Sequence, residues 1–258
     1  MLLEGRVAII SGIGPGLGRS IALALAREGA HVGLAARSED NLSSVAAEVE
    51  ELGRRAVWRS TDVARPEDCA KFVADAVDQL GGVDIVVNSA ARGNTGFSLA
   101  DSDLDDWRSA MEVSFFGALQ LTQAALPSLL ASDHGCVVNI GTLATRDIQP
   151  RQGAYAAAKM ALLTSTKTLA RELGGQGVRV NAVNPGYIAG APIQSYFERL
   201  ARESGGVAAD YERQITDQIA LGNIPSPDEI AGSVVYLASD LAKPVTGHVI
   251  ECNGGMWM

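Results

Sequence analysis

The sequence predicts a single α/β domain in which helices cover both faces of a doubly wound, parallel sheet. Two observations support this prediction. Short runs rich in β-branched residues alternate with longer helical patterns along most of the 258 residues. The first run also opens into a glycine-rich segment that leads into a helical pattern. A chain of this length suits one large α/β domain or two small ones, and no linker or repeat divides it.

The expected sheet has about seven strands. Each candidate run is apolar at neighbouring positions, which is typical of parallel strands that are buried on both faces. The seven runs span residues 6–11, 31–36, 56–61, 83–88, 135–141, 178–184 and 247–251.

Helical patterns fill the intervals between these runs, at 18–29, 38–53, 65–81 and about 104–130. The first three end near Gly29, Gly53 and Gly81, and glycine commonly ends a helix. Residues 190–226 break the alternation with polar helical sequence. We therefore expect one domain over 1–258 with a substrate lid at about 189–226.

The composition is that of an ordinary globular protein, with 47% hydrophobic and 20% charged residues. No apolar run of 18 residues is apparent, and the N-terminus has neither a cationic region nor a cleavage site, so we expect a cytoplasmic protein without a membrane span. The formal charge of −9 argues against nucleic acid as a partner.

Cysteine and histidine spacing predicts no metal site. The cysteines lie far apart and lack C-x-x-C spacing, which favours buried thiols over disulfides or zinc ligands. The histidines have no carboxylate or second histidine at ligand spacing, which favours structural roles. The residues concerned are Cys69, Cys136, Cys252, His31, His134 and His248.

The glycine loop, "SGIGPGLGR" at 11–19, fails the pattern G-x-G-x-x-G in every register but fits G-x-x-x-G-x-G through Gly12, Gly16 and Gly18. Between a strand and a helix, its backbone amides can bind an anion such as a pyrophosphate. A tight turn without a ligand is the alternative. A P-loop is excluded because no Lys-Ser or Lys-Thr follows the last glycine.

Tyr155 and Lys159 are candidates for acid-base chemistry. Four residues apart on a helix, they project from one face. A tyrosine acts as an acid or base near neutral pH only if its pKa is lowered, and a nearby ammonium favours the phenolate. Thr142, at the end of the strand over 135–141, offers a hydroxyl to a carbonyl oxygen. The alternatives are a surface pair and a hydroxyl that satisfies the backbone.

Further landmarks follow in order: "TDV" with Asp62, "NSAA" at 88–91, "YAAAK" at 155–159, "NPG" at 184–186 and "TGHVIECNGG" at 246–255. With the glycine loop, they make nearly the whole chain resemble the classical short-chain dehydrogenase/reductase family. The resemblance implies a Rossmann-type fold and hydride transfer between a nicotinamide cofactor and a carbonyl or secondary alcohol. It also implies a homo-oligomer, a tetramer or a dimer.

The resemblance assigns roles to four catalytic candidates. Tyr155 would be the general acid in reduction, and Lys159 would lower its pKa and bond the nicotinamide ribose. Thr142 stands where the family has serine and would orient the carbonyl. Ser114 stands where the family has an asparagine that holds a proton-relay water.

The resemblance also assigns a cofactor-binding set. Within it, Asp62 would accept a hydrogen bond from the adenine amino group, although it could instead cap the following helix. The set is Gly12, Gly16, Leu17, Gly18, Arg37, Asp62, Val63, Asn88, Ala90, Tyr155, Lys159, Pro185, Gly186 and Ile188.

Cofactor choice depends on the end of the second strand. Ala36 stands where NAD-binding members tend to place an acid for the ribose 2′-hydroxyl, and Arg37 follows it. A guanidinium can pair with a 2′-phosphate, so we expect NADP, with NAD as the alternative if Arg37 is only a solvated loop residue.

Two other kinds of function stay open. A regulatory protein could keep the cofactor site and lose turnover, and a relative could use the fold for isomerisation or elimination. Arg92, Arg146 and Arg151 flank the expected crevice, either to meet an anionic substrate such as an acyl thioester or as solvated side chains. The apolar tail "GGMWM" is expected to pack against the fold or a neighbouring subunit.

Overall fold

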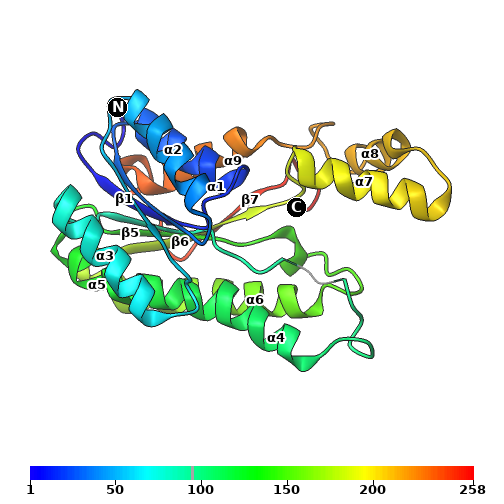
Figure 1. Ribbon diagram of the computed structural model, residues 1–258, viewed down its shortest axis with the longest axis horizontal. Helices are drawn as coiled ribbons and strands as arrows, with labels where there is room; N and C mark the ends of the chain where they lie inside the picture. The colour runs from blue at the N-terminus through cyan, green and yellow to red at the C-terminus, as the bar shows by residue number, and fades with distance from the viewer. Residues whose placement is uncertain (94–95) are drawn as a thin grey trace.

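A computed structural model describes residues 1–93 and 96–258 and contains a seven-stranded sheet. All neighbouring strands are parallel, in the order β3-β2-β1-β4-β5-β6-β7. The predicted doubly wound sheet is confirmed (Figure 1). The strands are β1 Val7–Ser11, β2 His31–Ala36, β3 Ala56–Ser60, β4 Ile85–Asn88, β5 Cys136–Ile140, β6 Arg179–Pro185 and β7 Val249–Cys252.

Helices cover both faces of the sheet. One apolar cluster joins α1, α2 and α9 to the sheet, and a second joins α3, α5 and α6 to its other face (Figure 1). The helices are α1 Leu17–Arg27, α2 Glu39–Glu51, α3 Pro66–Leu80, α4 Leu104–Met111, α5 Gly117–Ala131, α6 Gly153–Leu173, α7 Ala191–Ser204, α8 Ala208–Thr216 and α9 Pro227–Ala238.

Of the five inner strands, β1, β4 and β5 are buried along their whole length, and β2 and β6 are buried except at end residues. Strands β3 and β7 are partly exposed because they form the two edges of the sheet. The first three helices end as expected. Gly29, Gly53 and Gly81 follow α1, α2 and α3 with φ of 106°, 74° and 99°, a backbone region that glycine adopts without steric cost.

The strand order reverses between β1 and β4, which are neighbours in the sheet but not in the chain. Their last paired residues, Ser11 and Asn88, lie side by side, and Asn88 in turn pairs with Asn139 of β5. The crevice at this carboxyl edge is where doubly wound sheets bind ligands.

The helix expected at 104–130 runs from Leu104 to Ala131 but contains a π-helical turn at Glu112–Phe116. By length and composition this stretch is long and apolar enough to cross a membrane, with a mean hydropathy of 1.3 over its most apolar window, so the expectation of no such run was too strong. Leu121, Ala125 and Leu129 nevertheless pack into the apolar cluster beneath the sheet, as in a core helix.

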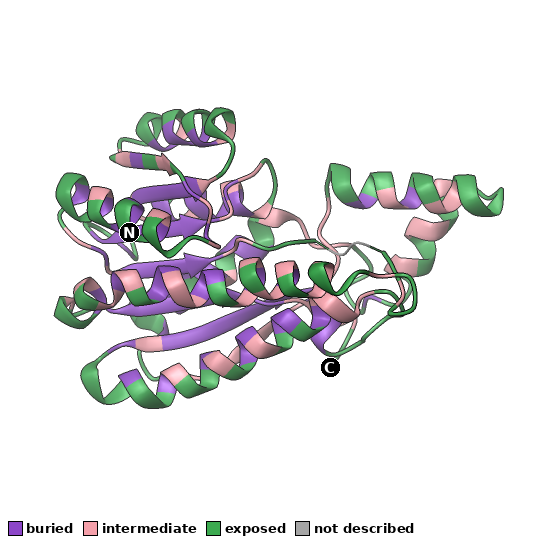
Figure 2. Ribbon diagram, turned by 60° about the horizontal axis from the view of Figure 1, so that its bottom comes forward, coloured by how far each residue is buried: buried purple, intermediate pink, exposed green. Residues whose placement is uncertain are grey.

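Helices α7 and α8 lie in the segment expected as an insertion and stand away from the sheet (Figures 1 and 2). Only Ile193 and Phe197 of these two helices are buried.

Buried polar side chains tie the sheet to two helices. Asn88 Nδ2 donates to Thr122 Oγ1 of α5 at 3.0 Å and to Asn139 Oδ1 at 2.9 Å. Asn139 Nδ2 donates to Thr166 Oγ1 of α6 at 2.9 Å. The polar ladder, Thr122-Asn88-Asn139-Thr166, therefore runs along one face of the sheet, from α5 across β4 and β5 to α6.

The thiols are free: Cys69 and Cys136 are buried, as expected, while Cys252 on the edge strand is half-buried. In the described part of the chain, no three histidine, cysteine or acidic side chains gather as metal ligands.

Candidate active site

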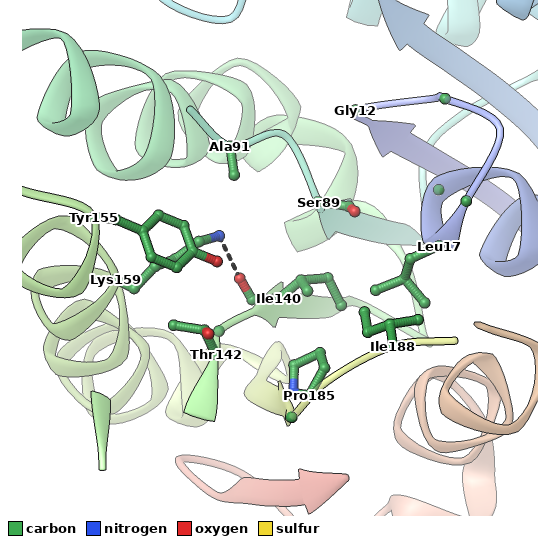
Figure 3. Close-up of a pocket in the computed structure, with 15 residues that line it drawn as sticks. Gly12, Leu17, Ser89, Ala91, Ile140, Thr142, Tyr155, Lys159, Pro185 and Ile188 are labelled. Atoms are coloured by element: carbon green, nitrogen blue, oxygen red, sulfur yellow. Dashed lines mark hydrogen bonds between the residues drawn. The ribbon is translucent and has the colours of Figure 1, made fainter. Parts of the chain in front are cut away.

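A cavity of about 280 Å³ lies at the carboxyl edge of the sheet where the strand order reverses (Figure 3). The glycine loop, the ends of β4, β5 and β6, and the first turns of α6 form its walls. The lining residues are Gly12, Gly14, Gly16, Leu17, Gly18, Ser89, Ala91, Ile140, Gly141, Thr142, Tyr155, Lys159, Pro185, Gly186 and Ile188.

The glycine loop presents the start of α1 to this cavity. Gly16 is the residue that caps α1, and it gives no side-chain hydrogen bond to the amides of the first turn. Gly12 has a φ of 83°, and a Cβ there would lie 2.5 Å from the Ala90 backbone nitrogen, so only glycine fits. A Cβ at Gly14 or Gly16 would meet nothing within 4 Å. The loop therefore offers open space and free backbone donors to an anion.

Thr142 is held by the backbone of the β5 end. Its amide donates to Asn184 Oδ1 at 3.1 Å, and its hydroxyl oxygen accepts from the Ala144 amide at 3.3 Å. The same hydroxyl lies close enough to the Tyr155 phenol to lower the pKa of that group. The structure thus brings the Thr142 and Tyr155 hydroxyls into one cavity. The alternative role of Thr142, a hydroxyl that satisfies the backbone, is also present in its bond with the Ala144 amide.

Tyr155 lies in the first turn of α6 with its hydroxyl directed into the cavity (Figure 3). Trp107 packs against the start of this helix, where a Cβ at Gly153 would come within 2.7 Å of the indole ring. Burial raises the pKa of the Tyr155 phenol, and the hydrogen bond from Thr142 lowers it in part. Tyr155 is therefore a protonated hydroxyl at neutral pH in this structure.

Lys159 is fully buried one turn further along α6. Its Nζ donates to the Ile140 carbonyl oxygen at 2.6 Å, and burial lowers the pKa of this ammonium to about 8 (Figure 3). We expected Lys159 to lower the pKa of Tyr155, but in this structure the phenol pKa is raised. The reason is that burial destabilises both charged groups and Lys159 is bonded to the sheet.

Ser114 does not line this cavity. It is fully buried in the π-helical turn, and its Oγ accepts from the Arg92 amide at 3.0 Å. A π-turn often marks a functional position, but this hydrogen bond gives Ser114 a structural task in holding the loop after β4.

Nine of the expected cofactor residues line the cavity and five do not. Asn88 belongs to the polar ladder, and Arg37 is exposed without an ion pair to any described residue. Asp62 Oδ1 accepts from the Ala64 amide at 3.1 Å, and α3 is capped by Arg65, so Asp62 is not the cap of that helix. The residues outside the cavity are Arg37, Asp62, Val63, Asn88 and Ala90.

Five lining residues were not expected: Gly14, Ser89, Ala91, Ile140 and Gly141. Strand alternation could have indicated Ser89 and Ala91, because side chains point alternately to opposite faces at the end of β4, away from the faces of Asn88 and Ala90. The Ile140 contribution could not be read from side-chain chemistry, since its functional group is a backbone carbonyl.

Two of the three arginines expected beside the crevice have charged or aromatic partners. Arg92 pairs with Asp106 at 3.1 Å. Arg146 pairs with Glu251 at 2.9 Å and stacks over Trp257, 4.9 Å from the ring centre. The tail therefore packs on the fold through Trp257, one of the two expected arrangements.

A second cavity, of about 190 Å³, adjoins the first and shares Thr142, Tyr155 and Gly186 with it. The two cavities thus meet at the hydroxyl pair. This arrangement can bind an anion-bearing molecule along the glycine loop and present a proton donor to a second molecule beside it.

Comparison with known proteins extends over almost the whole chain. Residues 12–257 match the family model described as enoyl-(acyl carrier protein) reductase. A 3-oxoacyl-[acyl-carrier-protein] reductase of Thermotoga maritima is 32% identical over 256 residues, which are 99% of this chain and 99% of that protein.

Solved structures show the same fold. A protein from Sinorhizobium meliloti described as a short-chain alcohol dehydrogenase has a TM-score of 0.90 and 34% identity, covering 98% of this chain and 97% of that one. The crystal structure of an NAD⁺-bound xylitol dehydrogenase has a TM-score of 0.92 and 26% identity, covering 99% of this chain and 100% of that one.

Proposed function

This chain belongs to the short-chain dehydrogenase/reductase family of NAD(P)-dependent oxidoreductases, and from that premise we propose that it transfers hydride between NADP(H) and a carbonyl or secondary alcohol. One observation carries the proposal. The Thr142 and Tyr155 hydroxyls line the same cavity as the free amides of the glycine loop.

The residues of the first cavity fit a dinucleotide. The uncapped start of α1 suits a pyrophosphate, and the open space above Gly14 and Gly16 would admit it. Pro185, Gly186 and Ile188 would form the opposite wall. When bound, the nicotinamide supplies the hydride acceptor or donor.

Tyr155 would donate its proton to the carbonyl oxygen during reduction and accept it during oxidation. Its raised pKa keeps the proton in place before reduction. Thr142 would orient the same oxygen through its hydroxyl. Lys159, held by Ile140, would bond the cofactor ribose and restore the Tyr155 proton after each turnover.

Ser114 would take part in a proton relay, and proton transfer through it would be slower than through the family asparagine. Its Oγ accepts from the Arg92 amide, which leaves its hydroxyl proton free to donate. We therefore propose a working but weakened relay.

Arg37 supports NADP as the cofactor. It is exposed directly after β2 and free to pair with a 2′-phosphate. The likeness to an NAD⁺-bound dehydrogenase favours NAD as the second candidate. We expect Arg37→Ala to weaken NADPH binding by about 1.5 to 3 kcal/mol and to change NADH binding little. Calorimetric titration of both cofactors tests this, and equal wild-type affinity for the two would leave NAD as the cofactor.

The proposed activity is tested by following nicotinamide absorbance with ketones, β-ketoacyl thioesters and steroids. Oxidation of NADPH with any carbonyl supports hydride transfer. Cofactor binding by calorimetry without turnover of any carbonyl would instead favour a regulatory protein.

We also propose a single domain with a lid at about 189–226, a cytoplasmic location and a homo-oligomer. The lid is supported by the exposed helices α7 and α8 near Ile188, which lines the cavity. Exposed apolar side chains at Phe116 and Met160 support subunit contacts. Proteolysis of residues 191–216 should slow when cofactor and substrate are bound, and light scattering gives the oligomeric state.

A further inference from the structure

The second cavity is polar where it meets the reacting hydroxyl groups. It is lined by Thr142, Leu143, Ala144, Asp147, Gln149, Gln152, Tyr155, Gly186, Tyr187 and Met256. Because it shares Thr142 and Tyr155 with the proposed cofactor cavity, a substrate carbonyl addressed by those hydroxyls would extend into it.

Gln152 contributes an unsatisfied acceptor. It is the N-cap residue of α6, three residues before Tyr155, and both residues line this cavity. Its side chain does not cap the helix, and its Oε1 is buried without a hydrogen-bond partner among the described residues. A buried acceptor without a partner is unfavourable until a ligand donates to it.

Asp147 contributes a second acceptor, since an ionised carboxylate accepts hydrogen bonds and donates none. It lies near the phenol of Tyr187, whose pKa is raised by burial and by the charges of Tyr196 and Asp147. Both groups belong to the cavity lining.

The neighbouring arginines do not balance this carboxylate. Arg146 is engaged with Glu251 and Trp257, and Arg92 with Asp106. Neither they nor Arg151 lines the cavity. The Gln152 acceptor and the exposed Asp147 carboxylate therefore favour a ligand group that donates hydrogen bonds over an anionic one.

We propose that the substrate is a ketone with a hydroxyl group on the carbon next to the carbonyl, and a vicinal diol in the opposite direction. This rests on the proposed hydride transfer. The carbonyl oxygen faces Tyr155 and Thr142, and the neighbouring hydroxyl donates to Gln152 Oε1. In reduction the carbonyl carbon gains the hydride of the reduced cofactor and its oxygen gains the Tyr155 proton, which gives the diol and the oxidised cofactor.

A β-ketoacyl thioester fits these groups less well. Its thioester carbonyl places a further acceptor, and no donor, beside the reacting ketone. Facing Gln152 Oε1, that oxygen would leave this buried acceptor still without a donor.

The test compares matched substrates that differ only in the adjacent hydroxyl. Initial rates with NADPH and with NADH are measured for acetoin against butan-2-one, for 2-hydroxyacetophenone against acetophenone, and for acetoacetyl-coenzyme A. We expect kcat/KM at least about tenfold higher for the hydroxylated member of a pair. Because a hydroxyl group also makes a ketone more reactive, the same pairs are measured with two variants.

Gln152→Leu removes the acceptor, and Gln152→Glu keeps one. We expect Gln152→Leu to lower kcat/KM for the hydroxyketones about tenfold while the plain ketones change less than about twofold. Gln152→Glu should retain the preference. Circular dichroism and cofactor titration show that both variants fold and bind cofactor.

Three results would overturn the inference. Equal kcat/KM within each pair, or a preference for acetoacetyl-coenzyme A, leaves hydride transfer intact and rejects only the substrate class. Equal losses on both members of a pair in Gln152→Leu reject the role of Gln152. The absence of cofactor oxidation with every carbonyl rejects the proposed function itself, and the inference with it.

Discussion

Lys159→Met removes a buried charge, so its free energy of unfolding, compared with that of the wild type, measures what this charge costs the folded protein. Burial lowers the Lys159 pKa from 10.5 to about 8. At about 1.4 kcal/mol per pKa unit, this lowering corresponds to about 3 kcal/mol of destabilisation while the lysine is charged. The loss of the hydrogen bond to Ile140 offsets part of the gain, because an unpaired buried carbonyl costs about 1 to 3 kcal/mol.

The pH dependence separates these two contributions. The folded protein holds the Lys159 proton less tightly than the unfolded chain, so the unfolded state binds more protons between about pH 8 and 10.5. The free energy of unfolding contributed by this group therefore rises with pH across that window. Between pH 7 and 9.5 the wild type should recover about 2 kcal/mol that Lys159→Met does not, whereas the Ile140 carbonyl contributes equally at both pH values.

Urea unfolding followed by circular dichroism, at fixed protein concentration and without cofactor, measures this difference. Lys167→Met is the matched control, because Lys167 is exposed on the same helix. The wild type and Lys167→Met should change alike with pH. A difference in unfolding free energy between the wild type and Lys159→Met that stays constant between pH 7 and 9.5 would refute the account of Lys159 as a charge held at a desolvation cost.

Three further substitutions address the reaction. Tyr155→Phe should lower turnover by more than about 10²-fold while cofactor affinity stays within a few-fold, and a variant that keeps a tenth of the activity would exclude Tyr155 as the acid. Thr142→Val removes the hydrogen bond that lowers the Tyr155 pKa, so the rise of alcohol oxidation with pH should move to higher pH; an unmoved profile contradicts that coupling. Ser114→Asn should raise the rate and reduce the solvent isotope effect if proton transfer limits turnover, and a slower variant, or one unchanged in both, would show that Ser114 is not a weakened relay.

Much of the fold could be predicted because its signal is local. Each inner strand is a short apolar run, and each early helix stops near a glycine that adopts a positive φ. The π-helical turn at Glu112–Phe116 gave no such signal, because one extra residue in a helical turn hardly changes the spacing of apolar positions.

The candidate site was predictable where side-chain chemistry marks it. Thr142, Tyr155 and Lys159 meet in one cavity, as expected from their order at a strand end and on a helix face. Sequence could not predict how burial sets their pKa values, since that depends on packing from elements distant in the chain. The same limit applies to Arg146, whose partner Glu251 lies on a strand 105 residues away in sequence.

The polar ladder has a consequence for how this enzyme can evolve. Thr166 lies two helical turns beyond Lys159, and its hydrogen bond to Asn139 fixes the position of α6 along its axis relative to β5. A helix packed only through apolar contacts can shift along a sheet at little cost, and one turn of such a slide is about 5.4 Å. The ladder opposes this slide, which would displace Tyr155 and Lys159 on the same helix. Selection on reaction rate therefore also acts on the ladder residues. Substitution at Asn139 or Thr166 would affect reaction rate, although neither residue takes part in the chemistry.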